Sequence, residues 1–545
     1  MGVLHIDDMT AAASAPVDDG NGPLTTAPKI SAKAAAAAAK ALTFPGTGYV
    51  FGLAPAADAN AGIGGHFDPP VSWPLVGLHE ILLPDGRVLN YGTNESAANT
   101  FVYDVWNPAL GDSSAAHSVL PNTTATDIFC SFQSLNWSTG EVLITGGDSG
   151  GLFRTNQGNN QTTIFSPQTN TIRSQGMMEY PRWYPTIVDM PNGDMVTLGG
   201  YKNSTLATTT PEVYNSSASP NWRTIAGATS NDAFGLTQGG WFYPKAWVSP
   251  QGGIFLIANT GKMYAIDPTG NGAISVYPNS AARGSMTLPT VMYAPGMLLS
   301  LRLAPGAATA PLVQTINING PQPVVTTIAN IDQLRLWSTA TVLADGRVAV
   351  TGGSAKANAA VNPDYTVEIW DPTTGQWTAG AVAQKYRLYH SIALLLPDAT
   401  VLTGGGGAPG PVTNRNAEIY YPPYLYLNDG SGQPAPRPML TGAPTAITIG
   451  QDVTAAVGPS DVISRVTFVR TGSDTHSTNI DQRFLDLPFT QSGNSVTATL
   501  PTDPNMLAPG YWMLFVFANE APSVAQIILV TPAGSTTTQM ASRAK

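Results

Sequence analysis

Short apolar and β-branched runs, separated by tight turns, recur along most of the chain. Many of these runs end in a pair of glycines, and the pairs are spaced by about fifty residues. The clear and weaker examples are Gly146-Gly147, Gly199-Gly200, Gly352-Gly353, Gly404-Gly405, Tyr91-Gly92, Ala258-Asn259 and Leu299-Ser300. This period predicts an all-β fold whose main part is a seven-bladed Kelch-like β-propeller between about residues 70 and 425.

The turn inside each repeat separates the first two strands of a blade, as Asp85-Gly86 and Asp345-Gly346 do. The first strand then begins about nine or ten residues before the turn glycine, or before Ala399 in the last repeat. The residues at these positions are Cys130, Tyr184, Tyr243, Trp337 and Tyr389-His390. Because the inner strands of a propeller start at the same end of its channel, we expect these side chains to converge.

The remainder of the chain is organised differently. A Pro/Gly-rich linker at 429–438 precedes short alternating strands such as 463–469 and 495–500, which predict an immunoglobulin-like β-sandwich. If His476 acts with the propeller residues, its long loop must reach into the channel. We divide the chain into the four segments 1–65 (a partly disordered extension with an alanine-rich stretch), 66–430 (the propeller), 431–535 (the sandwich) and 536–545 (a tail).

Composition excludes several classes of function. The chain has 25 Lys and Arg against 35 Asp and Glu, and its net charge is −10 with no basic patch. Because there is no basic patch, we expect no nucleic-acid partner. Because no apolar run is long enough to cross a bilayer, we also expect no membrane association. We expect a monomer. No secretory signal pattern is visible at the start of the sequence.

Cys130 is the only cysteine, so it cannot form an internal disulfide. Alone it would usually be a small buried hydrophobe, but a thiol can also be a metal ligand, a nucleophile or a partner in another covalent bond. Two imidazoles and two phenols make a nitrogen and oxygen donor set that favours Cu(II). Copper carries one electron whereas alcohol oxidation takes two, and a Tyr-Cys thioether could store the second electron as a ligand radical.

The segments that carry these residues also resemble a known family. The matching segments are Phe129-Cys130, Arg182-Trp183-Tyr184-Pro185, Arg387-Leu388-Tyr389-His390-Ser391, Thr475-His476-Ser477-Thr478-Asn479, Asp481-Gln482-Arg483, Pro509 to Phe515 and Ala521 to Ala525. Together they resemble the copper-radical oxidase family of galactose oxidase and glyoxal oxidase, and the likeness runs from about residue 70 to residue 532.

The resemblance implies a single copper ion held by Tyr184, Tyr389, His390 and His476. It implies that Tyr184 is thioether-linked to Cys130 and bears the radical, and that Tyr389 takes the substrate hydroxyl proton. The implied reaction oxidises a primary alcohol or small aldehyde and reduces O2 to H2O2. The resemblance also implies a secreted or periplasmic protein.

Two departures from the family pattern bear on substrate. Where galactose oxidase has a tryptophan that stacks over the thioether, this chain reads Gly200-Tyr201-Lys202, so radical shielding is lost or another ring supplies it. Where galactose oxidase has a sugar-binding arginine, the chain has Trp241, Phe242 and Tyr243. We take Trp241, Tyr243 and Tyr201 as substrate-binding candidates. Such an aromatic pocket suits a small or apolar primary alcohol or aldehyde better than a hexose.

Two other functions fit parts of the sequence. A non-catalytic Kelch propeller that binds a glycan or a protein accounts for the repeats but leaves Cys130 and its neighbours unexplained. A propeller glycosidase would need paired carboxylates, whereas the predicted cluster is phenolic and imidazole-rich. His79 lies off the predicted ligand register, and we interpret it as structural. Measurement of bound copper distinguishes the oxidase from both alternatives.

Overall fold

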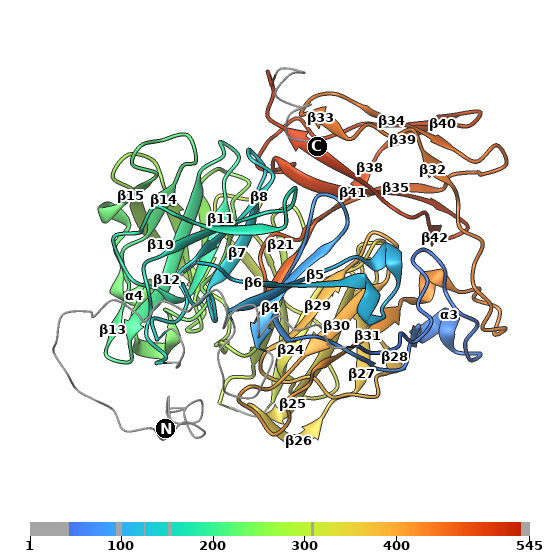
Figure 1. Ribbon diagram of the computed structural model, residues 1–545. Coiled ribbons are helices and arrows are strands. Elements are labelled where there is room, and N and C mark those ends of the chain that lie inside the picture. Colours follow the sequence, from blue (N-terminus) through green and yellow to red (C-terminus); the bar gives the residue numbers. More distant parts are fainter. Residues whose placement is uncertain (1–42, 94–100, 125, 151–154, 307–309, 536–545) are drawn as a thin grey trace.

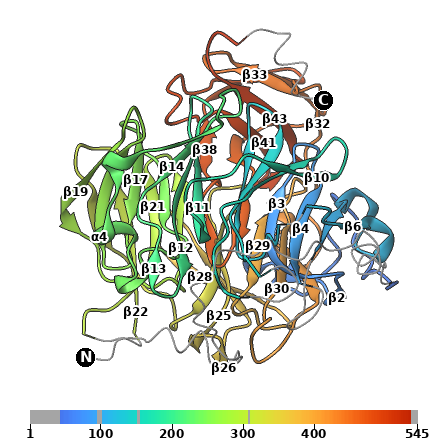
Figure 2. The same ribbon diagram turned by 60° about the vertical axis from the view of Figure 1, so that its left-hand side comes forward.

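The computed structural model describes residues 43–93, 101–124, 126–150, 155–306 and 310–535. Seven antiparallel sheets form a ring of blades, and a β-sandwich built from the C-terminal part of the chain lies against them (Figures 1 and 2). The expected all-β class is confirmed. The alanine-rich stretch and the tail at 536–545 lie outside the described residues.

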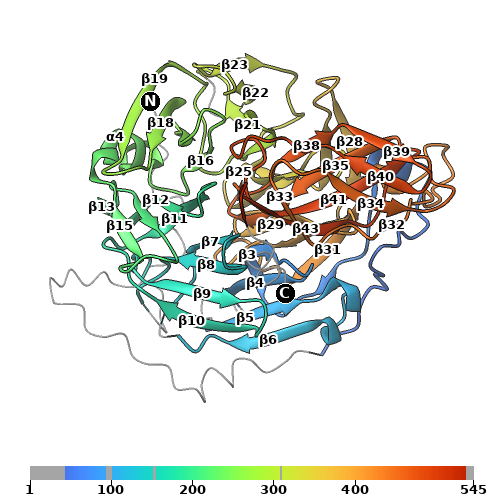
Figure 3. The ribbon, with the colours of Figure 1, turned by 90° about the horizontal axis from the view of Figure 1, so that it is seen from above.

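Each of the first three blades has its first strand nearest the centre and its last strand at the rim (Figure 3). Blade 1 consists of β3 (Val76–Leu82), β4 (Val88–Thr93), β5 (Val102–Trp106) and β6 (His117–Pro121). Blade 2 consists of β7 (Phe132–Asn136), β8 (Glu141–Thr145), β9 (Thr162–Ser166) and β10 (Thr171–Gln175). Blade 3 consists of β11 (Trp183–Asp189), β12 (Met195–Asn203), β14 (Glu212–Tyr214) and β15 (Trp222–Thr224), with the short β13 (Leu206–Ala207) on β12.

Blades 4 to 6 repeat this order. Blade 4 consists of β16 (Lys245–Val248), β17 (Ile254–Ile257), β18 (Lys262–Asp267) and β19 (Ala273–Ser280). Blade 5 consists of β20 (Thr290–Ala294), β21 (Met297–Leu303), β22 (Pro311–Asn317) and β23 (Val324–Thr327). Blade 6 consists of β24 (Leu336–Val342), β25 (Val348–Lys356), β27 (Thr366–Trp370) and β28 (Trp377–Val382), with β26 (Ala359–Pro363) on β25.

Blade 7 closes the ring with strands from both ends of the propeller. Its inner strands are β29 (Ser391–Leu395), β30 (Val401–Gly405) and β31 (Asn416–Tyr421), and its outer edge comes from β1 (His66–Phe67) and β2 (Val71–Ser72). Both short strands pair antiparallel with β31. The repeats did not predict this closure, because two-residue strands carry no periodic signal.

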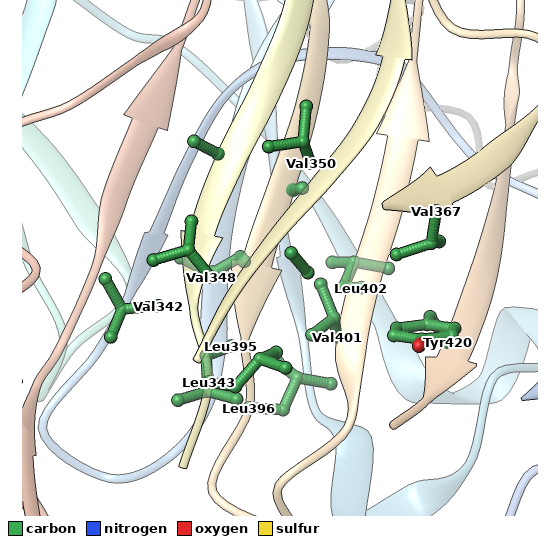
Figure 4. Close-up of a cluster of buried hydrophobic side chains, with 14 of the residues drawn as sticks. Val342, Leu343, Val348, Val350, Val367, Leu395, Leu396, Val401, Leu402 and Tyr420 are labelled. Atoms are coloured by element: carbon green, nitrogen blue, oxygen red, sulfur yellow. The ribbon is translucent and has the colours of Figure 1, made fainter. Parts of the chain in front are cut away.

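Apolar side chains fill the space between neighbouring blades. Figure 4 shows this between blades 6 and 7, where Val348 and Val350 lie beside Val401 and Leu402, all four fully buried. Burying a side chain of this size stabilises a fold by roughly 1.5–3 kcal/mol. The packing sets the spacing of the blades and so fixes where the inner strands begin around the axis.

Two sheets form the C-terminal sandwich. The first contains β32 (Leu440–Thr441), β34 (Val453–Val457), β40 (Ser495–Ala498) and β39 (Phe489–Ser492). The second contains β33 (Ala446–Thr448), β43 (Gln526–Thr531), β41 (Gly510–Ala518), β35 (Arg465–Arg470), β38 (Phe484–Leu487) and β42 (Ala521–Pro522). Phe468 and Trp512 are fully buried in the core between them.

One hairpin leaves the sandwich and joins the propeller. Its strands are β36 (Ser473–Thr475) and β37 (Thr478–Asn479), and β36 pairs with the innermost strand of blade 1. The pairing places Thr475 opposite His79, so the turn of the hairpin carries His476 into the centre of the ring. The predicted reach of this loop is therefore observed.

Helical turns are short and lie in connections. They are α3 (Ala61–Gly64), η1 (Pro108–Leu110), η2 (Ser114–Ala116), η3 (Ala226–Ala228), α4 (Asn231–Phe234), η4 (Thr237–Gly239) and η5 (Pro423–Leu425). Within the described part of the chain, none of the helices has the length and apolar character needed to cross a membrane.

Candidate metal centre

The residues selected by the repeat spacing share an unusual backbone conformation. At or beside the start of the first strands, φ is 57° at Cys130, 64° at Tyr184, 35° at Tyr243, 65° at Trp337 and 66° at His390. Left-handed conformations cost non-glycine residues roughly 1–3 kcal/mol each and persist only where the surroundings impose them. Their recurrence in blade after blade shows that the propeller repeat imposes the same backbone conformation at each of these positions.

Backbone hydrogen bonds between blades hold this position. The Tyr184 amide donates to the Cys130 carbonyl at 3.0 Å, and the Tyr243 amide donates to the Tyr184 carbonyl at 2.9 Å. Farther round the ring, the Trp337 amide donates to the Thr287 carbonyl at 2.7 Å. These bonds tie the starts of the inner strands of blades 2, 3 and 4 to one another, and tie the start of blade 6 to the segment before blade 5.

A thiol, two imidazoles and two phenols meet at this point. The potential ligand atoms of Cys130, His390 and His476 lie within 4.8 Å of one another, and all three residues are fully buried. The distance from Cys130 Sγ to His390 Nε2 is 4.0 Å, and the hydroxyls of Tyr184 and Tyr389 share a hydrogen bond. The five residues come from blades 2, 3 and 7 and from the sandwich hairpin, and their predicted convergence is observed.

The orientation of both histidines leaves Nε2 facing the cluster. His390 Nδ1 lies 2.7 Å from the Gly407 carbonyl oxygen. Because a carbonyl oxygen can only accept a hydrogen bond, Nδ1 carries the proton, and Nε2 carries the lone pair in the neutral ring. His476 Nδ1 lies 2.5 Å from Thr475 Oγ1, and its Nε2 is buried without a hydrogen-bond partner. Burial, with His390 and His79 adding, lowers the pKa of His476 well below its usual value. A neutral imidazole with an unpartnered nitrogen is suited to hold a metal.

The sequence does not single out two of the residues that orient these histidines. Gly407 supplies the carbonyl that fixes His390, and its φ of 109° together with a Cβ that would lie 1.9 Å from Val412 O requires glycine there. The run of four glycines from Gly404 to Gly407 was the available signal. For Thr475, the sequence offers no signal except that it is the neighbour of His476.

The phenols complete a donor set that fits a cation. Burial raises the pKa of Tyr184 well above its usual value, and Cys130, Tyr389 and Tyr243 raise it further. A buried phenol with these neighbours stays protonated unless a cation takes the place of its proton. Two imidazole nitrogens and two phenol oxygens form the nitrogen and oxygen set that suits Cu(II). The residues present therefore fit a copper ion.

Aromatic rings surround Tyr184. The ring of Trp183 lies 3.8 Å from that of Tyr184 between centroids, and Trp241 lies nearly parallel to Tyr184, at 19° and 6.0 Å. Tyr201 packs edge-on against both tryptophans, at 4.9 Å and 4.3 Å, and its hydroxyl donates to Asn156 O. The two tryptophans, whose centroids are 6.4 Å apart, thus pack next to each other against Tyr184, and Tyr201 contacts both of them.

The three substrate-binding candidates lie at different distances from the cluster. The ring of Tyr243 is 4.8 Å from that of His476, and its hydroxyl donates to Ser131 O at 2.9 Å. Trp241 contacts the cluster through Tyr184, whereas Tyr201 is one ring farther away. All three are largely buried, with 1%, 4% and 6% of their surface exposed for Tyr243, Trp241 and Tyr201. Their role in substrate binding stays a prediction.

Known proteins share both parts of this architecture. Residues 437–530 match the family model described as the galactose oxidase-like early set domain. A galactose oxidase of Gibberella zeae is 28% identical over 502 residues, which cover 86% of this chain and 71% of that protein. The aldehyde oxidase GLOX1 of Arabidopsis thaliana is 25% identical over 480 residues, which cover 76% of this chain and 75% of that protein.

A solved structure covers the propeller and the sandwich together. It is described as a novel fungal alcohol oxidase of the AA5 family in complex with copper, and it superposes with a TM-score of 0.75 at 25% sequence identity. The alignment covers 86% of this chain and 99% of that one. The chain is a homologue of the copper-radical oxidases. In this copper-radical oxidase homologue, the buried cluster of Cys130, His390 and His476 is the candidate copper site.

Proposed function

We propose that this copper-radical oxidase homologue is a mononuclear oxidase. It converts a primary alcohol to the aldehyde, or the hydrate of a small aldehyde to the acid, and reduces O2 to H2O2. The observation that carries the proposal is the meeting of Cys130, Tyr184, Tyr389, His390 and His476 at one buried point. A non-catalytic propeller that binds a glycan or a protein has no use for this set.

Four side chains would hold a single copper ion. They are the phenol oxygens of Tyr184 and Tyr389 and the Nε2 atoms of His390 and His476. When bound, copper would supply a one-electron acceptor and a positive charge that acidifies a substrate hydroxyl. Because the hydrogen bonds of Gly407 and Thr475 already fix both imidazoles, little reorganisation is needed to receive the ion.

The chain supplies the proton acceptor and the second redox centre. Tyr389, as the phenolate, takes the hydroxyl proton of the substrate, and the Tyr184 radical removes a hydrogen atom from the carbon that bears the hydroxyl. The alcohol loses two protons and two electrons in all. Dioxygen accepts them and leaves as hydrogen peroxide, which returns Tyr184 to the radical form and Tyr389 to the phenolate.

The radical form of Tyr184 depends on Cys130. We propose a thioether between Cys130 Sγ and the ring carbon ortho to the Tyr184 hydroxyl, which makes the phenol easier to oxidise. Its formation removes the thiol hydrogen and one ring hydrogen, with dioxygen as the two-electron oxidant. The side chains are already neighbours, since Cys130 is among the groups that raise the pKa of Tyr184.

Aromatic residues around the site favour a small or apolar substrate. Trp241 and Tyr243 lie beside Tyr184 and His476 and present rings where a hexose would need polar partners. The names of the relatives include a galactose oxidase, an aldehyde oxidase and an alcohol oxidase, so they leave the substrate open. We propose that the substrate is a primary alcohol or aldehyde. We also propose that residues 66–535 form the catalytic part, that the enzyme is a monomer, and that it is secreted or periplasmic.

The test is peroxide release by copper-loaded protein. The panel contains galactose, simple and aromatic primary alcohols, and glyoxal-type aldehydes, and His476→Ala serves as the inactive control. We expect one copper per chain and peroxide from at least one alcohol or aldehyde, with the highest rate on an apolar one. Copper-loaded protein that releases no peroxide from any member of the panel would falsify the oxidase proposal.

A further inference from the structure

A row of polar side chains is buried between blades 1 and 7. Strand pairing places Asp474 of β36 opposite Glu80 of β3, Glu80 opposite Asn90 of β4, and Asn90 opposite Asp104 of β5. Side chains at directly paired positions share one face of a sheet, so all four point the same way. Asp474 Oδ2 accepts a hydrogen bond from the Ala393 amide of β29, which identifies the facing blade as blade 7.

Most of the polar atoms in this row have no protein partner. Glu80 is 1% exposed and the other three residues are 0% exposed, yet both Glu80 oxygens, both Asn90 amide atoms, Asp474 Oδ1 and Asp104 Oδ1 accept or donate no hydrogen bond. Burial, followed by the charges of Asp474 and Asp104, raises the pKa of Glu80 well above its usual value. An unpaired buried carboxylate is costly, so these oxygens call for a partner.

The nearby basic side chains do not supply that partner. The Arg387 guanidinium donates to Glu418 and to the carbonyls of Gly405 and Asn416, and His117 pairs with the other oxygen of Asp104 at 2.7 Å. Lys245 influences Asp474, but burial lowers the pKa of Lys245 to about 7 and it makes no ion pair among the described residues. The charge of Arg387 acts against the rise in the Glu80 pKa, but among the described residues no basic side chain forms a hydrogen bond or an ion pair with Glu80.

Gly77 keeps a space open in front of these oxygens. A Cβ atom on Gly77 would lie 2.8 Å from Glu80 Oε1 and 3.2 Å from Asn90 Oδ1. The carboxylate and the amide oxygen are thus directed at the same small volume, which a single methyl group would fill. The backbone of Gly77 is not in the left-handed region, so its conformation does not account for the glycine.

We propose that Glu80, Asp474 and Asn90 bind an oxygen-preferring divalent cation of the Ca²⁺ class. Carboxylate and amide oxygens are the ligands that Ca²⁺ takes, and water completes its six to eight contacts. The site joins β36 to blade 1 and blade 1 to the neighbouring strand of blade 7. Because Asp474 precedes His476 on the same hairpin, the cation fixes the segment that brings His476 into the propeller.

The test is calcium binding by copper-free protein. We expect equilibrium dialysis against Ca²⁺, followed by atomic emission, to find one tightly held calcium per chain, and Tm to rise by several degrees over calcium-free buffer. Glu80→Gln removes a charge and Gly77→Ala fills the space while leaving every charge in place, so both variants should lose the calcium and the shift in Tm. Asp232→Asn, which removes an exposed carboxylate in α4, is the matched control and should retain both.

The result is independent of the copper chemistry. His390→Ala removes a proposed copper ligand and should bind calcium as the unmodified protein does. Failure of the oxidase proposal would leave this outcome unchanged. The site is overturned if unmodified protein holds no calcium and has the same Tm in both buffers. It is also overturned if folded Glu80→Gln and Gly77→Ala bind as much calcium as the unmodified protein. In either case Glu80 is buried as a neutral carboxyl group.

Discussion

The backbone amide of Tyr184 donates a 3.0 Å hydrogen bond to the carbonyl oxygen of Cys130. The bond joins the starts of two neighbouring blades, and both residues have left-handed backbones, with φ of 64° and 57°. The scaffold therefore places the thiol and the phenol next to each other before any covalent bond forms. A cofactor made from these two side chains needs no enzyme to bring them together.

The first prediction concerns that cofactor. Copper and oxygen should generate a thioether between Cys130 and Tyr184, and peptide mapping should recover the two segments joined, with two hydrogens missing. Cys130→Ala should keep the fold, because only a small buried side chain is lost, at a cost of about 1 kcal/mol. It should lower turnover by orders of magnitude, because a plain phenol is harder to oxidise. Fully active enzyme in which Cys130 reacts freely with an alkylating reagent would contradict the crosslink.

The second prediction compares two buried histidines. The ring centroids of His476 and His79 are 5.6 Å apart, but His79 stacks on Tyr91 and its Nδ1 bonds to Gln133 Oε1. His476→Ala should weaken copper binding by more than about a hundredfold, because it removes a ligand and not merely an orienting group. His79→Ala should retain copper at one ion per chain, measured by atomic absorption after dialysis.

The same reasoning applies to the whole sandwich. Deletion of the chain from about residue 430 onward should abolish copper oxidation chemistry, since His476 is carried by the C-terminal hairpin. Full activity in His476→Ala would mean that another histidine is the ligand. Loss of copper from His79→Ala, with His476→Ala unaffected, would assign that role to His79.

The third prediction concerns an ion pair between the propeller and the sandwich. Arg470 Nη2, at the end of β35, donates to Asp189 Oδ2 in blade 3 at 2.6 Å, and the side chains are 4% and 1% exposed. Asp189→Ala leaves a buried guanidinium unpaired and should reduce the free energy of unfolding by about 3–5 kcal/mol. Asp232→Ala, which breaks an exposed pair with Lys262, should cost no more than about 1 kcal/mol. Urea unfolding followed by tryptophan fluorescence measures both, and equal effects would refute the argument.

The sequence repeats predict most of the candidate site, because residues at the same point of each repeat lie at the same place in their blades and so meet near the propeller axis. Cys130, Tyr184 and His390 occupy equivalent points in different blades, so counting from turn glycines was enough to bring them together. His476 was reached through the family resemblance, since its hairpin belongs to a different domain. The fold brings these side chains together, and their types (thiol, phenol and imidazole) determine which ligand and reaction the site suits.

Other features depend on pairings that no local pattern reveals. Closure of blade 7 by β1 and β2 uses strands of two residues, which are too short for any periodicity to show. The acidic row that includes Glu80 and Asp474 exists only because β36 pairs with β3 across the domain boundary. The orientation of His390 depends on the carbonyl of Gly407, and a backbone acceptor has no sequence signature of its own.

The last prediction is about specificity and rests on Trp241. Its ring lies nearly parallel to Tyr184, and under the proposed pocket assignment Trp241 and Tyr243 contact the substrate with aromatic rings in place of hydrogen-bond donors. Hexose hydroxyls left unpaired against rings cost about 1–3 kcal/mol each, so galactose should lose to an apolar alcohol by at least roughly tenfold in kcat/KM. Trp241→Ala should weaken the use of aromatic and longer-chain alcohols more than that of the smallest ones, because it removes contact area and leaves the copper ligands intact. Tyr103→Phe, which removes only the blade 1 hydroxyl bonded to Asn170 O, is the control and should keep the order of preference. If galactose proves the best substrate, or if Trp241→Ala leaves the order unchanged, the pocket assignment is wrong even though the copper site stands.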